Sequence, residues 1–132
     1  MRKNRRMVFP SPAEIEFLRI MGGRFIIVSW IVDPKTKFPL TIILDLGKIL
    51  RRENIEREVR VGAMYIDFAT VGLSYNRGIE VDGAAYHEDI VKEQDRDDYL
   101  AARGWSVLHI RADEIYRNPG RVQQRVMNFL SS

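Results

Sequence analysis

The sequence predicts a single α/β domain with a central mixed β-sheet flanked by helices. The chain has 132 residues, which is the size of one compact domain. Hydrophobic residues make up 45% of it, enough for an ordinary core. The expected elements follow in the order helix, several strands including a meander, helix, strand and helix, which is typical of a mixed sheet. We expect a basic tail at residues 1–10 and one domain at residues 11–132.

The first expected helix begins after Ser11 and has a clear start signal. Ser11 is a favourable N-cap, Pro12 suits the first turn, and Glu14 stands where a capping box needs its acid. The pair of glycines beginning at Gly22 is expected to end this helix.

Runs rich in β-branched and aromatic residues predict the strands. Gly62 separates two of these runs and predicts a hairpin, while residues 46–52 fit either a short helix or a strand end. In the last run, alternation places Trp105 and His109 on one face. The expected strands are residues 24–32, 40–44, 54–60, 63–70, 78–82 and 105–111.

Two further helices are expected in the C-terminal half. The clearer one covers residues 88–103 and should end at Gly104. Residues 118–120, Asn-Pro-Gly, are expected to break the chain before a final amphipathic helix at residues 121–130.

The composition excludes several classes of protein. Cysteine is absent, so the chain has no disulfide framework and no thiolate metal site. No apolar run approaches the roughly 20 residues that span a bilayer, and none follows the basic N-terminus as in a signal peptide. We therefore expect a cytoplasmic protein, or one in the host-cell cytoplasm if a phage encodes it.

The charge distribution favours a polyanionic partner. The net charge is +3, and acidic residues dominate residues 88–98 whereas basic residues cluster elsewhere. Such a separation suits a protein that holds phosphates and a metal together. The candidate DNA-binding residues are Arg2, Lys3, Arg5, Arg6, Arg51, Arg52, Arg57, Arg60, Lys92 and Arg96.

Acidic residues inside two short apolar strands indicate a metal site. Asp67 stands between Ile66 and Phe68, and alternation would place both of those neighbours on the opposite face. Glu80 and Asp82 are two residues apart and share a face, where they repel each other unless a cation lies near them. A solvent-facing edge strand or strand end would explain the same residues without a metal.

His87 is the candidate proton carrier, because an unperturbed histidine titrates near neutral pH. Its alternative role is to cap the helix that begins near residue 88. Glu14 and Asp97 are further candidates, although the capping box explains Glu14 and a solvated helix face explains Asp97. His109, the other histidine, is expected to be structural or a minor contributor to the site.

The ordered motifs resemble one nuclease group. They are Ser-x-x-Glu on a first helix, an Ile-Asp-Phe-Ala strand, Ile-Glu-Val-Asp-Gly-x-x-x-His, and Leu-x-x-x-Gly-Trp-x-Val-Leu. Together they cover about residues 11–130 and resemble very-short-patch-repair (Vsr)-like endonucleases of the PD-(D/E)XK superfamily, including the catalytic domains of phage homing endonucleases. The resemblance implies a restriction-endonuclease-like core and metal-dependent cleavage of DNA, as in DNA repair.

The resemblance also implies a role for each matching residue. The matches are Glu14 for the first-helix acid, Asp67 for the metal-binding aspartate, Glu80-Val81-Asp82 for the second acidic strand, His87 for the histidine after the turn, and Asp97 for the acid on the following helix. One departure matters: the superfamily motif has a lysine where this chain has Asp82. His87 is the expected substitute.

The sequence thus predicts a Mg²⁺-dependent DNA endonuclease, with Mn²⁺ as a substitute, that nicks or cuts both strands. Asp67 and Glu80 would hold the metal, and Asp82 or the Val81 carbonyl would complete its shell. His87 would act as acid or base, oriented by Asp97. Three alternatives stay open: a catalytically inactive nuclease-fold module that binds nucleic acid, an interaction domain, and an RNA nuclease.

The expected substrate is double-stranded, mismatched or branched DNA. About ten residues precede the first helix, too few for a separate module that reads sequence. The chain is therefore expected to be a catalytic domain that works with an additional DNA-reading domain, a homodimer, or a structure-specific nuclease.

Overall fold

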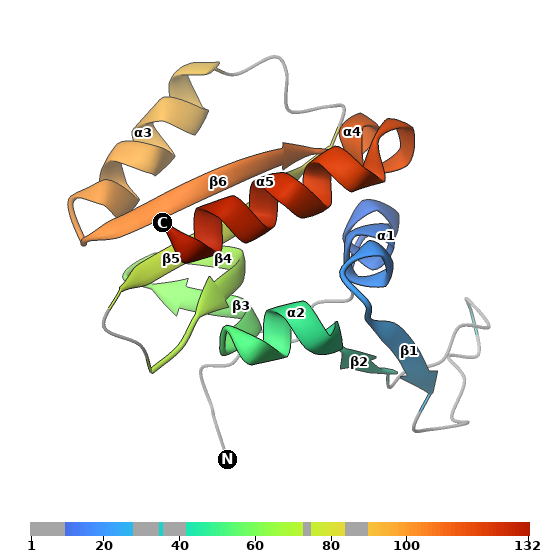
Figure 1. Ribbon diagram of the computed structural model, residues 1–132. Coiled ribbons are helices and arrows are strands. Elements are labelled where there is room, and N and C mark those ends of the chain that lie inside the picture. Colours follow the sequence, from blue (N-terminus) through green and yellow to red (C-terminus); the bar gives the residue numbers. More distant parts are fainter. Residues whose placement is uncertain (1–9, 28–34, 36–41, 73–74, 84–89) are drawn as a thin grey trace.

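The computed structural model describes residues 10–27, 35, 42–72, 75–83 and 90–132, and it confirms the α/β fold with a mixed sheet (Figure 1). The main sheet has four strands in the order β3-β4-β5-β6, and β1 pairs with β2 in a separate two-stranded sheet. The strands are β1 (Arg24–Ile27), β2 (Ile42–Asp45), β3 (Ile55–Val61), β4 (Met64–Thr70), β5 (Asn76–Asp82) and β6 (Trp105–Arg111). The helices are α1 (Pro12–Ile20), α2 (Gly47–Arg52), α3 (Ile90–Ala101), α4 (Ala112–Arg117) and α5 (Pro119–Ser131).

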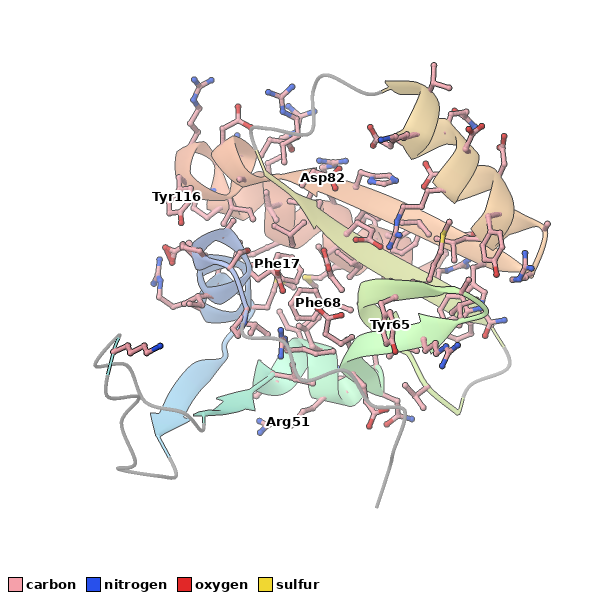
Figure 2. All side chains as sticks on the ribbon, turned by 180° about the vertical axis from the view of Figure 1, so that it is seen from behind. Phe17, Arg51, Tyr65, Phe68, Asp82 and Tyr116 are labelled. Atoms are coloured by element: carbon pink, nitrogen blue, oxygen red, sulfur yellow. The ribbon has the colours of Figure 1, made fainter. Side chains whose placement is uncertain are left out.

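Two hydrophobic clusters cover the two faces of the main sheet. The larger cluster packs side chains of α1, α2, α4 and α5 against one face, with the rings of Phe17 and Phe68 5.1 Å apart at its centre (Figure 2). The smaller cluster packs Leu100 and Tyr99 of α3 against the other face. The β6 strand alternates between them as predicted, because Leu108 contacts the larger cluster and Val107 the smaller.

The sheet joins an antiparallel hairpin to a parallel pair. Strands β3 and β4 form the predicted hairpin, with Gly62 at φ +60° in its turn. Strand β5 pairs antiparallel with β4 and parallel with β6, and α3 provides the connection that a parallel pair requires. Gly78 on β5 leaves room for Ile66, since a Cβ atom there would lie 2.8 Å from the Ile66 Cγ2 atom. This arrangement brings Tyr65 of β4 and Glu80 of β5 beside α3, whose Arg96 contacts both.

The hairpin departs from simple alternation at Glu58. Arg57 pairs with Phe68 and Val59 pairs with Ile66, whereas Glu58, between them, has a left-handed φ of +50°. Beyond this point the strands change face: Phe68 lies in the larger cluster but Ile66 in the smaller. The expectation that Ile66 and Phe68 share a face is therefore wrong, because the strand is irregular at the residue between them, Asp67.

The structure resolves one open assignment and differs from the sequence prediction at two helices. Residues 46–52, which fit either a short helix or a strand end, contain the helix α2. The short helix α4 was not expected, and it directly follows β6. The final helix begins at Pro119 rather than at residue 121, because Asn118 caps it by accepting a hydrogen bond from the Arg121 N–H, and proline suits a first turn.

The capping box of α1 is formed as predicted, and it gives a stability prediction. The Ser11 side chain accepts a hydrogen bond from the Glu14 N–H at 3.2 Å. Replacing Ser11 by alanine is expected to lower the free energy of unfolding by about 1 kcal/mol. Urea denaturation would measure this, with Ser106→Ala at an exposed position of β6 as the control. An equal loss in both variants would contradict the capping role.

Among the described residues, no helix has the length and apolar character needed to cross a membrane.

Candidate active site

Asp67 lies at the centre of the predicted site. Its Oδ2 atom accepts a hydrogen bond of 2.9 Å from the backbone N–H of Val81 on the neighbouring strand. This bond fixes the carboxylate at the place where β3 and β4 change face. Its charge raises the pKa values of both Glu80 on β5 and Glu14 on α1, so Asp67 lies near both carboxyl groups.

Glu80 is a buried acid on β5, with 7% of its surface exposed. Burial and the charge of Asp67 raise its pKa from 4.5 to about 8, although Arg96 opposes the shift. A carboxyl group with this pKa is mostly protonated near neutral pH in the metal-free protein. A carboxyl group whose pKa is raised by burial and by a neighbouring acid is a frequent feature of active sites.

Arg96 on α3 brings a positive charge to the two acids. Its Nη2 atom lies 2.6 Å from Glu80 Oε1, and the same nitrogen donates to the carbonyl of Tyr65 on β4. Because a guanidinium stays charged at all working pH values, Arg96 provides a permanent cation here. The sequence prediction assigned Arg96 to DNA binding, and the structure places it against Glu80.

Glu14 reaches the site from α1. Its Oε1 atom accepts the hydrogen bond of the Ser11 hydroxyl at 3.1 Å. Its Oε2 atom is buried and has no hydrogen-bond partner among the described residues, and Arg57 Nη2 lies 3.6 Å away. Burial, followed by the charge of Asp67, raises the pKa of Glu14. The capping role and a role at the site are therefore compatible, because each uses a different oxygen.

Glu58 is an acid of this group that the sequence did not indicate. One ligand oxygen from each of Glu14, Glu58 and Asp67 lies within 4.8 Å of the others. Glu58 takes part because its left-handed backbone turns it out of the regular β-strand pattern. Nothing in the local sequence signals such a conformation, which is uncommon for glutamate.

Asp82 belongs to a second group, together with Glu93 and His109. Asp82 Oδ2 lies 2.9 Å from His109 Nδ1, and Glu93 Oε1 lies 3.3 Å from the same nitrogen. Asp97 contacts the other side of the ring, with Oδ1 2.9 Å from Nε2. The hydrogen bond to Asp82 contributes most and that to Asp97 adds to it, so the His109 pKa is raised to about 9 despite burial. Asp97 thus orients His109 in the described structure.

The remaining candidates divide by location. Arg51, which Figure 2 labels, and Arg52 are exposed in the last turn of α2. Arg60 is exposed on β3, and Lys92 is exposed on α3. Arg57 is half-buried and faces Glu14, so its charge lies at the acidic group. Five predicted residues lie outside the described part of the chain: Arg2, Lys3, Arg5, Arg6 and His87.

The raised pKa of Glu80 predicts a pH-dependent stability. Because the folded state holds its proton more tightly than the unfolded state, this contribution is full below pH 4.5 and is lost as pH rises through about 8. In the presence of chelator, we expect the free energy of unfolding to fall across this range. Glu80→Gln should reduce the fall, which urea denaturation at several pH values would show. An unchanged profile would contradict the assignment.

Comparison with protein families gives one match. The REase_MTES_1575 model, which describes a restriction-endonuclease-like domain, matches residues 46–130, more than half of the chain. Comparisons with curated proteins and with solved structures give no significant match. The matched segment runs from the start of α2 to the end of α5 and includes Asp67, Glu80 and Arg96, whereas Glu14 precedes it. The family indicates a nuclease with DNA as its substrate. The chain therefore belongs to the REase_MTES_1575 family of restriction-endonuclease-like domains.

Proposed function

We propose that this chain is a Mg²⁺-dependent DNA endonuclease of the Vsr-like type, and that residues 11–132 form its catalytic domain. The observation that carries the proposal is the position of Asp67. It accepts the Val81 N–H, raises the pKa of Glu80, and lies within 4.8 Å of ligand oxygens from Glu14 and Glu58. Four acids from four different elements are thus gathered beside Arg96 and Arg57.

The residues present fit a hard divalent cation. Mg²⁺ prefers carboxylate and carbonyl oxygens, and the described group offers both. The buried Glu14 Oε2 atom forms no hydrogen bond among the described residues, and its ion pair with Arg57, at 3.6 Å, compensates its charge only in part. We assign Asp67, Glu80 and the Val81 carbonyl as metal ligands, with Mn²⁺ as a substitute. Asp82 is left out because its carboxylate contacts His109.

A bound Mg²⁺ would neutralise charge on the phosphate and help to generate the attacking hydroxide. Arg96 supplies the positive charge that the superfamily motif assigns to lysine, and its bond to Glu80 holds that carboxylate toward Asp67. Arginine does not lose its proton in proteins, so it cannot act as the base. We keep His87 as the proposed acid or base, which would protonate the leaving 3′ oxygen or activate the water.

Exposed cations are proposed to hold the DNA backbone. Arg51, Arg52, Arg60 and Lys92 are exposed on three elements and can contact phosphates, as can the basic tail at residues 1–10. Contacts of this kind position DNA without reading its sequence, and they weaken as salt rises. Mismatched and branched duplexes are therefore tested beside plain double-stranded DNA, and a homodimer or an additional domain remains the proposed source of any sequence preference.

Cleavage of supercoiled plasmid tests the proposal. We expect nicking or linearisation with Mg²⁺, none with EDTA, and a loss of about a hundred-fold or more in Glu80→Gln. Glu16→Gln is the matched control, because Glu16 pairs with Arg19 on the surface of α1 and belongs to neither acidic group. Cleavage by Glu80→Gln at the parental rate would overturn the site. Salt-dependent binding without cleavage of any duplex would instead favour an inactive binding module.

A further inference from the structure

We propose that Asp82, Glu93 and His109 form a second cation site, distinct from the catalytic acids, which binds a transition-metal ion such as Zn²⁺ and ties α3 to β5 and β6. The three residues come from the end of β5, the first turns of α3 and the middle of β6. One ligand atom from each lies within 4.8 Å of the other two. One ion can therefore contact three elements that are separate in the sequence.

The ligand set points to a particular class of ion. One imidazole nitrogen and two carboxylate oxygens suit Zn²⁺, Co²⁺ or Mn²⁺ better than Mg²⁺, which seldom takes nitrogen ligands. Asp82 and Glu93 both approach His109 at the same nitrogen, Nδ1, at 2.9 and 3.3 Å. Both oxygens therefore converge on the side of the ring where a metal ion would replace the Nδ1 proton.

The opposite side of the ring is arranged as in known metal sites. Asp97 accepts a hydrogen bond from Nε2, with its two oxygens 2.9 and 3.0 Å away. Metal-bound histidines almost always donate their second N–H to a carboxylate or carbonyl, which fixes the ring and strengthens the ligand. Asp97 would thus orient His109 without touching the ion itself.

Charge also favours a divalent cation at this place. Three carboxylates surround one imidazole, so even a protonated ring leaves an excess of two negative charges. Arg96, the next residue to Asp97, is directed to Glu80. The side chains of the site are only half-buried, and Glu93 is 41% exposed, which gives an ion a route from solvent.

The site is separate from the catalytic acids but adjacent to them. Asp82 follows Glu80 by two residues on the same face of β5, about 6–7 Å along the strand. Arg96 and Asp97 are neighbours on α3, and one contacts each group. An ion at this second site would therefore hold α3 in the position from which Arg96 reaches Glu80, while leaving the catalytic carboxylates free for Mg²⁺.

Zn²⁺ titration of the full chain tests this inference without any measurement of cleavage. The Glu80→Gln variant is titrated by calorimetry in excess Mg²⁺, so that loss of the proposed catalytic function does not affect the result. We expect one Zn²⁺ per chain and a rise in melting temperature on binding. In the Glu80→Gln background, a further His109→Gln substitution should abolish saturable Zn²⁺ binding. A further Asp97→Asn substitution should weaken Zn²⁺ binding by about 10–100-fold.

His87→Gln is the matched control, because the chain contains only two histidines. Retention of Zn²⁺ binding in this variant supports the inference, and its loss there but not in His109→Gln would overturn it. Nitrogen NMR of the imidazole rings provides a second measurement that needs no substitution at His109. A Zn²⁺-dependent shift of His109 Nδ1 is expected, and a His109 ring that stays unchanged at saturation would refute the site.

Discussion

Replacing Asp67 by asparagine is expected to lower the rate of Mg²⁺-dependent DNA cleavage by about a thousand-fold or more. Asparagine has the same shape, and its carbonyl oxygen can still accept the Val81 N–H, so the strand geometry should persist. The substitution removes the negative charge of Asp67, which acts on the neighbouring acids Glu80 and Glu14. Initial rates of plasmid nicking at saturating Mg²⁺ would measure the effect.

A second measurement distinguishes loss of charge from loss of fold. Because the charge of Asp67 contributes to the raised Glu80 pKa, Asp67→Asn should lower that pKa toward its ordinary value in metal-free protein. Carbon NMR of the glutamate carboxyl groups would follow the titration. Asp98→Asn, on the exposed side of α3, makes the same chemical change and should alter neither quantity. A folded Asp67→Asn variant that still cuts normally would remove Asp67 from the site.

Replacing Phe68 by alanine is expected to lower the free energy of unfolding by about 3–5 kcal/mol. Phe68 is fully buried in the larger cluster, against the ring of Phe17. Its removal leaves a cavity between β4 and α1, the elements that carry Asp67 and Glu14. Since small domains are stable by only about 5–15 kcal/mol, a large part of the stability would be lost.

Urea denaturation would measure this change, with Met127→Ala as the control. Met127 is 47% exposed on α5, so its truncation should change stability by only about 0.5 kcal/mol. Phe68→Leu keeps most of the buried volume and should cost less than about half as much as Phe68→Ala. A loss in Phe68→Ala no greater than that of the control would show that the cavity collapses without cost.

Local signals in the sequence were sufficient for most of the fold. The cap at Ser11, the turn at Gly62 and the alternation from Trp105 to Arg111 each depend on neighbouring residues, and each is confirmed. The sequence does not predict the helix α4, because a helix of six residues has too few turns to show a helical period. Ile115 is its single fully buried residue, and one buried residue gives no repeating hydrophobic pattern in the sequence.

The candidate site could be predicted only in part, because residues from distant parts of the chain come together only in the folded protein. Asp67 and Glu80 were identified as acids in apolar strands, a feature visible in the chain itself. Glu58 required a left-handed backbone that glutamate rarely adopts, and Arg96 required the docking of α3 over β4 and β5. The partner of Asp82 was unpredictable for the same reason: His109 becomes its neighbour only when β6 lies beside β5.

The position of α1 has a consequence for the order in which the chain becomes competent. This first helix is held by the last two, since Tyr116 donates to the Pro12 carbonyl and Gln123 to that of Ile20, across 104 and 103 residues. A chain synthesised only as far as β6 would lack these two hydrogen bonds and the α4 and α5 side chains of the larger cluster, so we expect α1 to hold Glu14 beside the other acids only after α4 and α5 have folded. We therefore expect the acidic group to be completed last as the chain is synthesised.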